Sequence, residues 1–372
     1  MSPIDLNWLD GRLLRLQGPD RPWSIMLRAH FVKPQSVLAV ERAWSIVAAA
    51  RPELSSVLAE PLVWEPAATG GQVVLGPVEP YLDRPARPGR DRVVCVVADA
   101  DPASSISIVV NHAFTDGIGC RWIVNDVLLA LAGEVVATRT PVTSEHLDGL
   151  RSRGLAVTGA LGQIPWRRPL VLGADPGATT EMATNSVSLD VIGSRRREEG
   201  VSLNGLVVAA VTDAIASISQ PSRRAVVIGV PADLRRHVGG PTGIGNAVVN
   251  LSLAIPNRSA AQHVDRFIER RATRHHLGAA LAWYRRAARP GPPRLLQRSG
   301  RSVATAMVSN IGLVATGDHW TNVSAIDFAP PAHQTTSIGV VGYGDQLSVT
   351  VRSRSTGVAE PLAHAARDRL LG

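Results

Sequence analysis

The chain has 372 residues, of which 45% are apolar and 19% are charged, and this composition excludes a disordered, collagen-like or coiled-coil protein. The net charge of +8 comes almost entirely from arginine, since Lys33 is the only lysine, and it permits anionic partners. Because only 4% of the residues are aromatic, few side chains could stack on bases, and no nucleic-acid partner is expected.

The length predicts two lobes at about 100–200 residues per domain. We place them at 1–165 and 185–372, joined by a crossover linker at 166–184. No apolar run reaches the roughly 18 residues of a membrane span, and the first residues lack the pattern of a signal peptide. These features predict a cytoplasmic monomer without a membrane span. Cys95 and Cys120 lie in apolar surroundings and are expected to be buried rather than disulfide-bonded or metal-bound.

In the first half, strands alternate with helices. Ser2 and Pro3 form a helix-start signal. Apolar residues spaced three and four apart between Pro34 and Ala50 predict an amphipathic helix that ends before Pro52. The predicted strands are Trp23–Val32, Gln72–Val78, Asp91–Val97 and Ser104–Asn111, and a further helix is predicted at Gly119–Ala132.

The second half follows a stretch rich in Pro, Gly and Arg, from Gly133 to Thr184, that is typical of a connection. Periodicity then predicts strands at 185–191, 225–230, 247–255, 305–309 and 323–328, a hairpin of 336–341 with 346–351, and helices at 202–217, 262–289 and 360–371. Each half mixes strands with helices, so the predicted fold class is α/β or α+β.

The strongest functional signal is His112, which stands at the end of a predicted strand and is followed by Asp116 and Gly117 before a helix. A strand end presents an imidazole rigidly, and a pKa of about 6.5 lets the ring accept a proton at neutral pH. Asp116, in a turn that Gly117 relaxes, can fix this loop by pairing with a basic group.

The segment His112–Gly117 resembles the His-x-x-x-Asp-Gly motif of thioester-dependent acyltransferases. This superfamily holds chloramphenicol acetyltransferase, the condensation domains of nonribosomal peptide synthetases, polyketide-associated acyltransferases, and bacterial wax ester synthase/diacylglycerol acyltransferases. Further stretches are similar to family segments in the same order, namely Ser2–Leu9, Ala50–Leu54, Leu203–Ala210, Val230–Arg235 with Gly245–Asn246, and Val308–Gly312.

Two positions depart from the family pattern. Asn111 stands where the family often has a second histidine, which leaves the base itself in place. Gly205 stands where the wax ester synthase branch has the aspartate of an Asn-Asp pair, which puts in doubt any bond that this aspartate makes. The chain is also shorter than a typical condensation domain, so we expect a reduced lid or bridging segment and more open substrate channels.

The resemblance implies two chloramphenicol-acetyltransferase-like lobes that form a V with a central cleft, and a tunnel that leads to His112 from each face. The donor would be an acyl-CoA or an acyl carrier protein, and the acceptor a small molecule with a hydroxyl or amine group. His112 would take the proton of the acceptor. No bound cofactor is expected, because the thioester is a co-substrate carried by CoA or a phosphopantetheinyl group.

Other roles follow from the same resemblance. Ser309 and Asn310, in the late family segment, are predicted to donate to the oxyanion. Asp116 is expected to be structural, with its side chain turned away from the cleft and paired with Arg235 or Arg12.

Two arginine runs stand in the region 262–289, and each allows two interpretations. They are a solvated helix face, or a dock for an acidic carrier protein or for CoA phosphates, with Arg285 and Arg286 as the main candidates. The second run also contains Arg289, and the first comprises Arg270, Arg271 and Arg274.

No metal site is predicted. The adjacent His275 and His276 face different sides of a helix, and the other histidines considered have no companions at ligand spacing, namely His237, His319 and His333.

We therefore expect an acyltransferase that forms an ester or an amide in bacterial specialised-metabolite or lipid biosynthesis, the bacterial setting being suggested by a GC-rich composition. Two alternatives stay open. The same histidine is repurposed for cyclisation or dehydration, or the fold is a non-catalytic module that binds carrier proteins.

Overall fold

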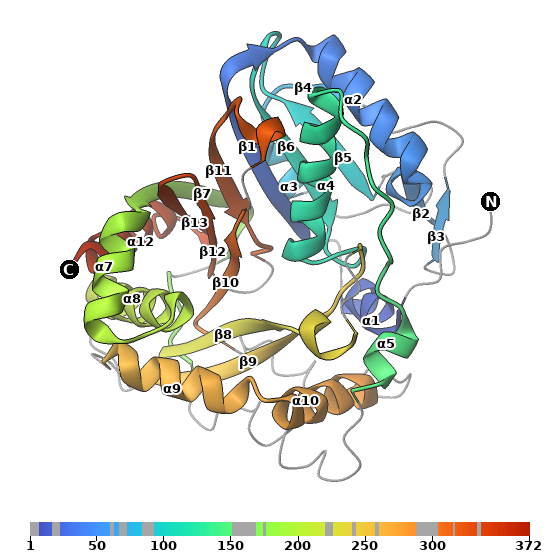
Figure 1. Cartoon of the computed structure of the whole chain (residues 1–372). Coiled ribbons are helices and arrows are strands. Elements are labelled where there is room, and N and C mark those ends of the chain that lie inside the picture. The colour runs from blue at the N-terminus through green and yellow to red at the C-terminus, as the bar shows by residue number, and fades with distance from the viewer. Residues whose placement is uncertain are drawn as a thin grey trace.

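The computed structural model describes residues 7–16, 23–59, 63–66, 73–83, 93–150, 169–173, 176–219, 226–239, 243–256, 260–287, 304–314, 317–332 and 336–372. These residues form a five-stranded sheet, a six-stranded sheet and a two-stranded pair, with helices packed on the two larger sheets (Figure 1). The predicted mixed α/β class is confirmed.

The first sheet has the strand order β11-β1-β6-β5-β4. Along β1, Ile25 and Leu27 face the helices α2 and α4, whereas Met26 lies on the opposite face with Val97 and Val109. This alternation is the two-residue period of a strand buried on both faces. The elements are β1 (Ser24–Gln35), β4 (Val73–Leu75), β5 (Val94–Ala98), β6 (Ala103–Asn111), β11 (Val323–Ala329), α2 (Val37–Ala50) and α4 (Gly117–Leu131).

The second sheet has the strand order β7-β13-β12-β10-β8-β9. Its strands are β7 (Pro176–Ser188), β8 (Val226–Asp233), β9 (Val248–Ile255), β10 (Ala306–Leu313), β12 (Thr336–Tyr343) and β13 (Gln346–Ser355). The helices near it are α7 (Leu189–Glu199), α8 (Leu203–Ile218), α9 (Ala261–Arg271), α10 (Arg274–Ala287) and α12 (Ala359–Leu371).

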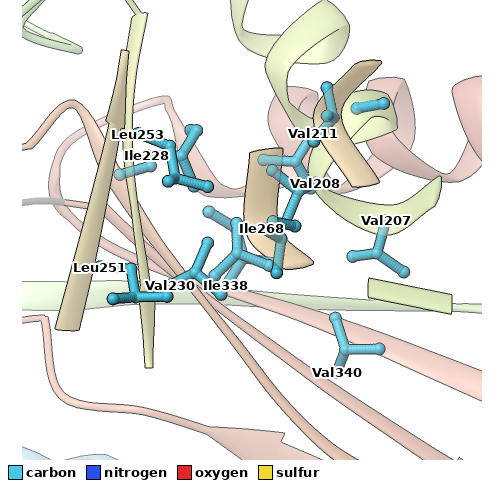
Figure 2. Close-up of a cluster of buried hydrophobic side chains, with 14 of the residues drawn as sticks. Val207, Val208, Val211, Ile228, Val230, Leu251, Leu253, Ile268, Ile338 and Val340 are labelled. Atoms are coloured by element: carbon cyan, nitrogen blue, oxygen red, sulfur yellow. The ribbon is translucent and has the colours of Figure 1, made fainter. Parts of the chain in front are cut away.

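Branched aliphatic side chains fill the space between this sheet and its helices (Figure 2). α8 contributes Val207, Val208 and Val211, and the strands contribute Ile228 and Leu253 among others. Full burial of each such side chain contributes about 1.5–3 kcal/mol to the free energy of unfolding.

The two sheets are joined by β11, which follows β10 in the chain but pairs with β1 in the first sheet. Its backbone lies against β12, where a Cβ on Gly339 would stand 1.8 Å from the carbonyl oxygen of Phe328. Arg352 of β13 is fully buried and donates to the carbonyl oxygens of Ser24 and Leu82, both in the first half of the chain.

The structure corrects the prediction around the linker. β7 begins at Pro176, inside the predicted linker 166–184, and ends at Ser188, where we expected a strand at 185–191. Ser188 caps α7 by accepting from the amide of Asp190, so the chain turns into a helix there. The lobe boundaries otherwise stay a prediction, although β11 shows that one strand of the C-terminal region belongs to the first sheet.

Two further elements differ from expectation. The helical region predicted at 262–289 is divided into α9 and α10, with the break at Ala272 and Thr273. β8 continues through Pro231, where we expected it to end. Among the described strands, β10 pairs with β8 only at Ile228 and Gly229, and beyond them β8 pairs with β9 alone. A proline is tolerated there because it lies where one edge of the strand has no partner.

The remaining described elements are short: α1 (Trp8–Leu16), β2 (Ser56–Ala59), β3 (Val63–Pro66), α3 (Glu79–Leu82) and α5 (Ser144–Asp148). Among the described residues no single helix is long and apolar enough to cross a membrane, while α7 and α8 together, as a bent pair, pass that test on length and composition.

Candidate functional site

His112 follows directly after the last residue of β6, where Asn111 pairs with Ser24 of β1. Its amide donates to the carbonyl oxygen of Trp23 over 2.6 Å, and the two rings lie with their centroids 5.9 Å apart. The side chain is partly exposed. The sheet therefore fixes the backbone of His112, and Trp23 lies against one side of its ring.

The ring of His112 has a defined tautomer. Its Nδ1 lies 3.0 Å from the carbonyl oxygen of Thr115. A carbonyl can only accept a hydrogen bond, so Nδ1 carries the proton and the lone pair of the neutral ring is on Nε2. Burial lowers the pKa of His112, although the Thr115 carbonyl and the charge of Asp116 act in the opposite direction. The ring is therefore neutral at pH 7, with Nε2 available as a base.

Asp116 is a buried N-cap. One oxygen accepts from the amides of Ile118 and Gly119 at the start of α4, and the other accepts from Ala247 and from Arg235, the latter over 2.8 Å. Burial alone would raise the pKa of Asp116, but the charge and hydrogen bonds of Arg235 outweigh burial and lower it. Of the two arginines that we considered, Arg235 is therefore the one found paired with Asp116.

Gly117 lies where a side chain would not fit. A Cβ at this position would stand 2.8 Å from the side chains of both Ile311 on β10 and Phe328 on β11. Arg121 of α4 also donates to the carbonyl oxygen of Ile311. Strands of the C-terminal half therefore pack directly against the turn that holds His112 and Asp116.

Three consecutive residues of one loop bind three residues of the His112–Gly117 turn. The amide of Gly245 donates to the hydroxyl of Thr115, and the amide of Ala247 donates to Asp116. Between them, Nδ2 of Asn246 donates to the carbonyl oxygen of His112 over 2.8 Å. The loop before β9 thus holds the turn at three successive points.

Asp10 of α1 supports this loop from behind. It is buried, and one of its oxygens accepts from both the amide and the Nδ2 of Asn246, at 3.0 and 2.7 Å. Burial raises the pKa of Asp10 well above its ordinary value, against the effect of its hydrogen bonds from Asn246 and Asn7. Asn246 therefore links α1 to the backbone of His112.

The two predicted oxyanion donors lie on β10, in the strand that continues to Ile311 beside Gly117. The amide of Asn310 is already engaged, because its Nδ2 donates to Asn204 over 2.8 Å and its Oδ1 accepts from Gly312. Ser309 is half-buried and its hydroxyl has no partner in the described part of the chain. A role of either residue toward an oxyanion stays a prediction.

The structure explains why a glycine stands at position 205, where the resemblance leads us to expect an aspartate. A Cβ on Gly205 would stand 2.5 Å from the Cβ of Asp265, which lies on α9. The carboxylate of Asp265 accepts from both the amide and the hydroxyl of Ser202, the N-cap of α8. A carboxylate is therefore present at this helix start, but α9 supplies it and the glycine makes room for it.

The arginines proposed for docking have different surroundings. Arg285 forms an ion pair with Asp148 of α5, and its guanidinium lies 6.0 Å from the ring of Trp8. The side chain of Arg286 lies outside the described residues, as do Arg289 and the side chain of Arg274. Arg270 is exposed, and Arg271 lies over the ring of Phe267. Docking stays a prediction.

The remaining histidines and the cysteines do not gather at the site. His319 contacts Asn125 of α4, His276 contacts Thr273, His237 lies in a short turn after β8, and His333 and the His275 side chain lie outside the described residues. Within the described ranges no three metal-ligating side chains come together. Cys120 is fully buried and burial raises the pKa of its thiol, whereas Cys95 is half-buried.

Sequence reasoning missed the residues that hold the turn. Asn246 stood in a segment that resembles the family, Asp10 stood near a predicted helix start, and Trp23 opened a predicted strand. Asn246 and Trp23 contact the backbone of His112 across 134 and 89 residues, and Asp10 acts through Asn246, 236 residues away. An asparagine after a glycine is ordinarily read as a turn residue. The one sequence feature that could have indicated the contact between Asn246 and His112 is the segment Gly245–Asn246, whose resemblance to the family did not predict a role for the asparagine.

Comparison with known proteins gives structural matches only. No family model and no curated protein matches the sequence. Among solved structures, the cyclization-docking bidomain of EpoB from Sorangium cellulosum has a TM-score of 0.71 and 16% identity, over 100% of this chain and 85% of that chain. Polyketide synthase associated protein 5 from Mycobacterium tuberculosis has a TM-score of 0.67 and 14% identity, over 100% and 98%.

A third similar structure is the starter condensation domain of rhizomide synthetase, a mutant in complex with C8-CoA and Leu-SNAC. Its TM-score is 0.66 at 14% identity, over 99% of this chain and 93% of that chain. At such identities the similarity establishes the fold. The chain has the condensation-domain fold, which is related to chloramphenicol acetyltransferase, along its whole length.

Proposed function

We propose that this protein is an acyltransferase that moves an acyl group from a thioester to the hydroxyl or amine of a small acceptor. Nε2 of His112 takes the acceptor proton as the oxygen or nitrogen attacks the thioester carbonyl. The observation that carries the proposal is the 3.0 Å contact from Nδ1 to the Thr115 carbonyl oxygen, because it leaves Nε2 as the basic nitrogen of a residue that is partly exposed.

The reaction then balances within one tetrahedral intermediate. Attack converts the thioester carbonyl to an oxyanion, and a preorganised donor stabilises such a charge by about 3–4 kcal/mol. We assign this task to the hydroxyl of Ser309 rather than to Asn310, whose amide is bound to Asn204. Collapse breaks the C–S bond, and the imidazolium of His112 returns its proton to the departing thiolate.

The donor is a thioester of CoA or of a carrier protein, and the setting is bacterial natural-product or lipid biosynthesis. The similar starter condensation domain was solved with C8-CoA and Leu-SNAC, which supports a thioester for this fold. Arg285 and Arg286 are the proposed contacts for an acidic carrier or for CoA phosphates. Because Asp148 already pairs with Arg285, the contribution of Arg285 to docking is smaller than its charge suggests.

The test incubates the protein with acyl-CoAs or acylated carrier proteins and with hydroxyl or amine acceptors, and follows the intact masses of carrier and acceptor. We expect an acylated acceptor and a free thiol in equal amounts. His112→Ala should lower the rate of transfer by about 10²–10⁴ and leave thermal unfolding unchanged. His364→Ala, which alters an exposed histidine of α12, is the matched control and should keep the rate.

Two outcomes would replace the proposal. Loss of water from a carrier-bound substrate, without transfer, would indicate a fold repurposed for cyclisation or dehydration. Carrier binding without any turnover, equally strong in His112→Ala, would indicate a non-catalytic module.

A further inference from the structure

The first sheet carries a cavity of about 390 Å³ on its face opposite α2 and α4. β1 contributes Arg28 and His30 to the wall, and β6 contributes Ser105 and Ser107. Along β1 these residues alternate with Leu27, which packs with the helices on the other face. The wall that these strands form is therefore polar, whereas Val78 and Val97 among others add apolar surface to the cavity. The cavity is also in the size range of small-molecule pockets.

This cavity is separate from the surroundings of His112. In the antiparallel pairing of β1 with β6, His30 lies opposite Ser105, whereas Ser24 lies opposite Asn111, next to His112. Six residues of strand correspond to about 20 Å at roughly 3.3 Å per residue. A ligand in this cavity would not touch the imidazole.

Arg28 is a half-buried cation with unused donors. Its Nε donates to the hydroxyl oxygen of Ser107 over 2.9 Å, and its two terminal amines form no hydrogen bond or ion pair within the described chain. Asp327 is the cross-strand neighbour of Arg28 on β11, but its carboxylate lies 2.8 Å from Nε2 of His30. The guanidinium therefore offers a forked set of donors, which suits a carboxylate.

Two acidic residues also line the cavity and restrict the ligand. Glu79 and Asp99 are exposed at the cavity, and Asp99 also accepts from the amide of Ser105. One guanidinium beside two carboxylates disfavours a doubly charged anion and favours a ligand that also carries a positive charge. His30 and Asp327 are already paired with each other across β1 and β11.

We propose that this cavity binds a small zwitterion, with its carboxylate on the terminal amines of Arg28 and its ammonium toward Glu79 and Asp99. The site is independent of the proposed transferase activity. Arg28 and Ser107 lie on paired strands, whereas Glu79 lies at the start of α3 and Asp99 follows the end of β5. The hydroxyl of Ser107, which accepts from Arg28, is left with its proton free to donate to the same carboxylate.

The test is ligand-observed NMR or calorimetry on the full chain with glycine, β-alanine and γ-aminobutyrate, and with acetate and inorganic phosphate for comparison. We expect at least one of the zwitterions to bind more tightly than acetate, and phosphate to bind most weakly. Arg28→Gln should weaken zwitterion binding about tenfold or more. Arg42→Gln, which removes an exposed arginine of α2, is the matched control and should bind as the wild type does.

A second variant tests the ammonium position. Glu79→Gln should weaken binding of the zwitterion and leave acetate binding unchanged or stronger. Thermal unfolding of each variant checks that the sheet is intact, and Glu79 is exposed, so this variant is expected to fold. The proposal is overturned if the wild type binds none of the zwitterions, if phosphate binds as tightly as they do, or if Arg28→Gln binds like the wild type.

Discussion

One hydrogen bond decides which nitrogen of His112 is basic. Because Nδ1 donates to the Thr115 carbonyl, which belongs to the same turn, the tautomer is set by residues within the motif. The position of His112 at the end of a strand could be predicted from the sequence, and so could the pairing of Asp116 with Arg235 as one of two candidates. The role of His112 as a base stays a prediction. The contacts of Asn246 could not be predicted, because its partners come from two distant segments, the start of α1 and the end of β6.

Asn246 is expected to act as a positioning residue. Asn246→Ala removes the donor to the His112 carbonyl and should lower kcat of acyl transfer about tenfold with little change in KM. It should also shift the NMR titration of the His112 ring, which a purely structural role would leave unchanged. The control is Asn322→Ala, which removes a half-buried asparagine bonded to the backbone of Lys33, far from the turn. Equal effects of the two variants on kcat would contradict this role.

At the scale of elements, a helix or strand is predicted well where its hydrophobic periodicity agrees with the residues that mark its start and end. The helix α4 and the strand β6 lie within two residues of prediction. The errors fall where tertiary contacts decide: β7 extends because β13 pairs with it along its length, and β8 continues past Pro231 because its partner there is β9. The residues within β7 or β8 do not indicate which strand will pair with them.

The start of α8 provides a test at this scale. Gly205→Asp introduces the aspartate expected from the resemblance in sequence, but it would place a second buried carboxylate against Asp265. We expect the free energy of unfolding to fall by about 3 kcal/mol or more, as measured by urea denaturation. Combining the change with Asp265→Ala should recover part of the loss. If Gly205→Asp were as stable as the wild type, the space beside Asp265 would not require a glycine at position 205.

At the scale of the molecule, buried ion pairs and hydrogen bonds join the two halves of the chain. Arg235 of the second half binds Asp116 of the first, and Arg352 of β13 binds the carbonyl of Ser24. Because such contacts join distant segments, the fold class could be predicted from the sequence, but the way in which the sheets join could not. The expected tunnel to His112 stays a prediction.

Acid should weaken the ion pair between Asp116 and Arg235, which joins the two halves of the chain. Because the pKa of Asp116 is lowered in the folded state, its stabilising contribution is present above its unfolded pKa of about 3.9 and is lost as the pH falls through its folded pKa. Asp116→Asn should therefore be less stable than the wild type by about 3–5 kcal/mol at pH 7, and this difference should shrink below about pH 4. Urea denaturation at several pH values measures it, with the exposed Asp345→Asn as control. A difference that does not change with pH would contradict the ion-pair account.

The most direct measurement compares the pH dependence of kcat/KM for acyl transfer with the NMR titration of the His112 ring in the same protein. Since burial lowers the pKa of this ring, we predict that the titration midpoint lies below about 6.5 and that the acid limb of kcat/KM falls at the same pH. A rate that persists at pH values where the ring is already protonated would contradict the assignment of His112 as the base.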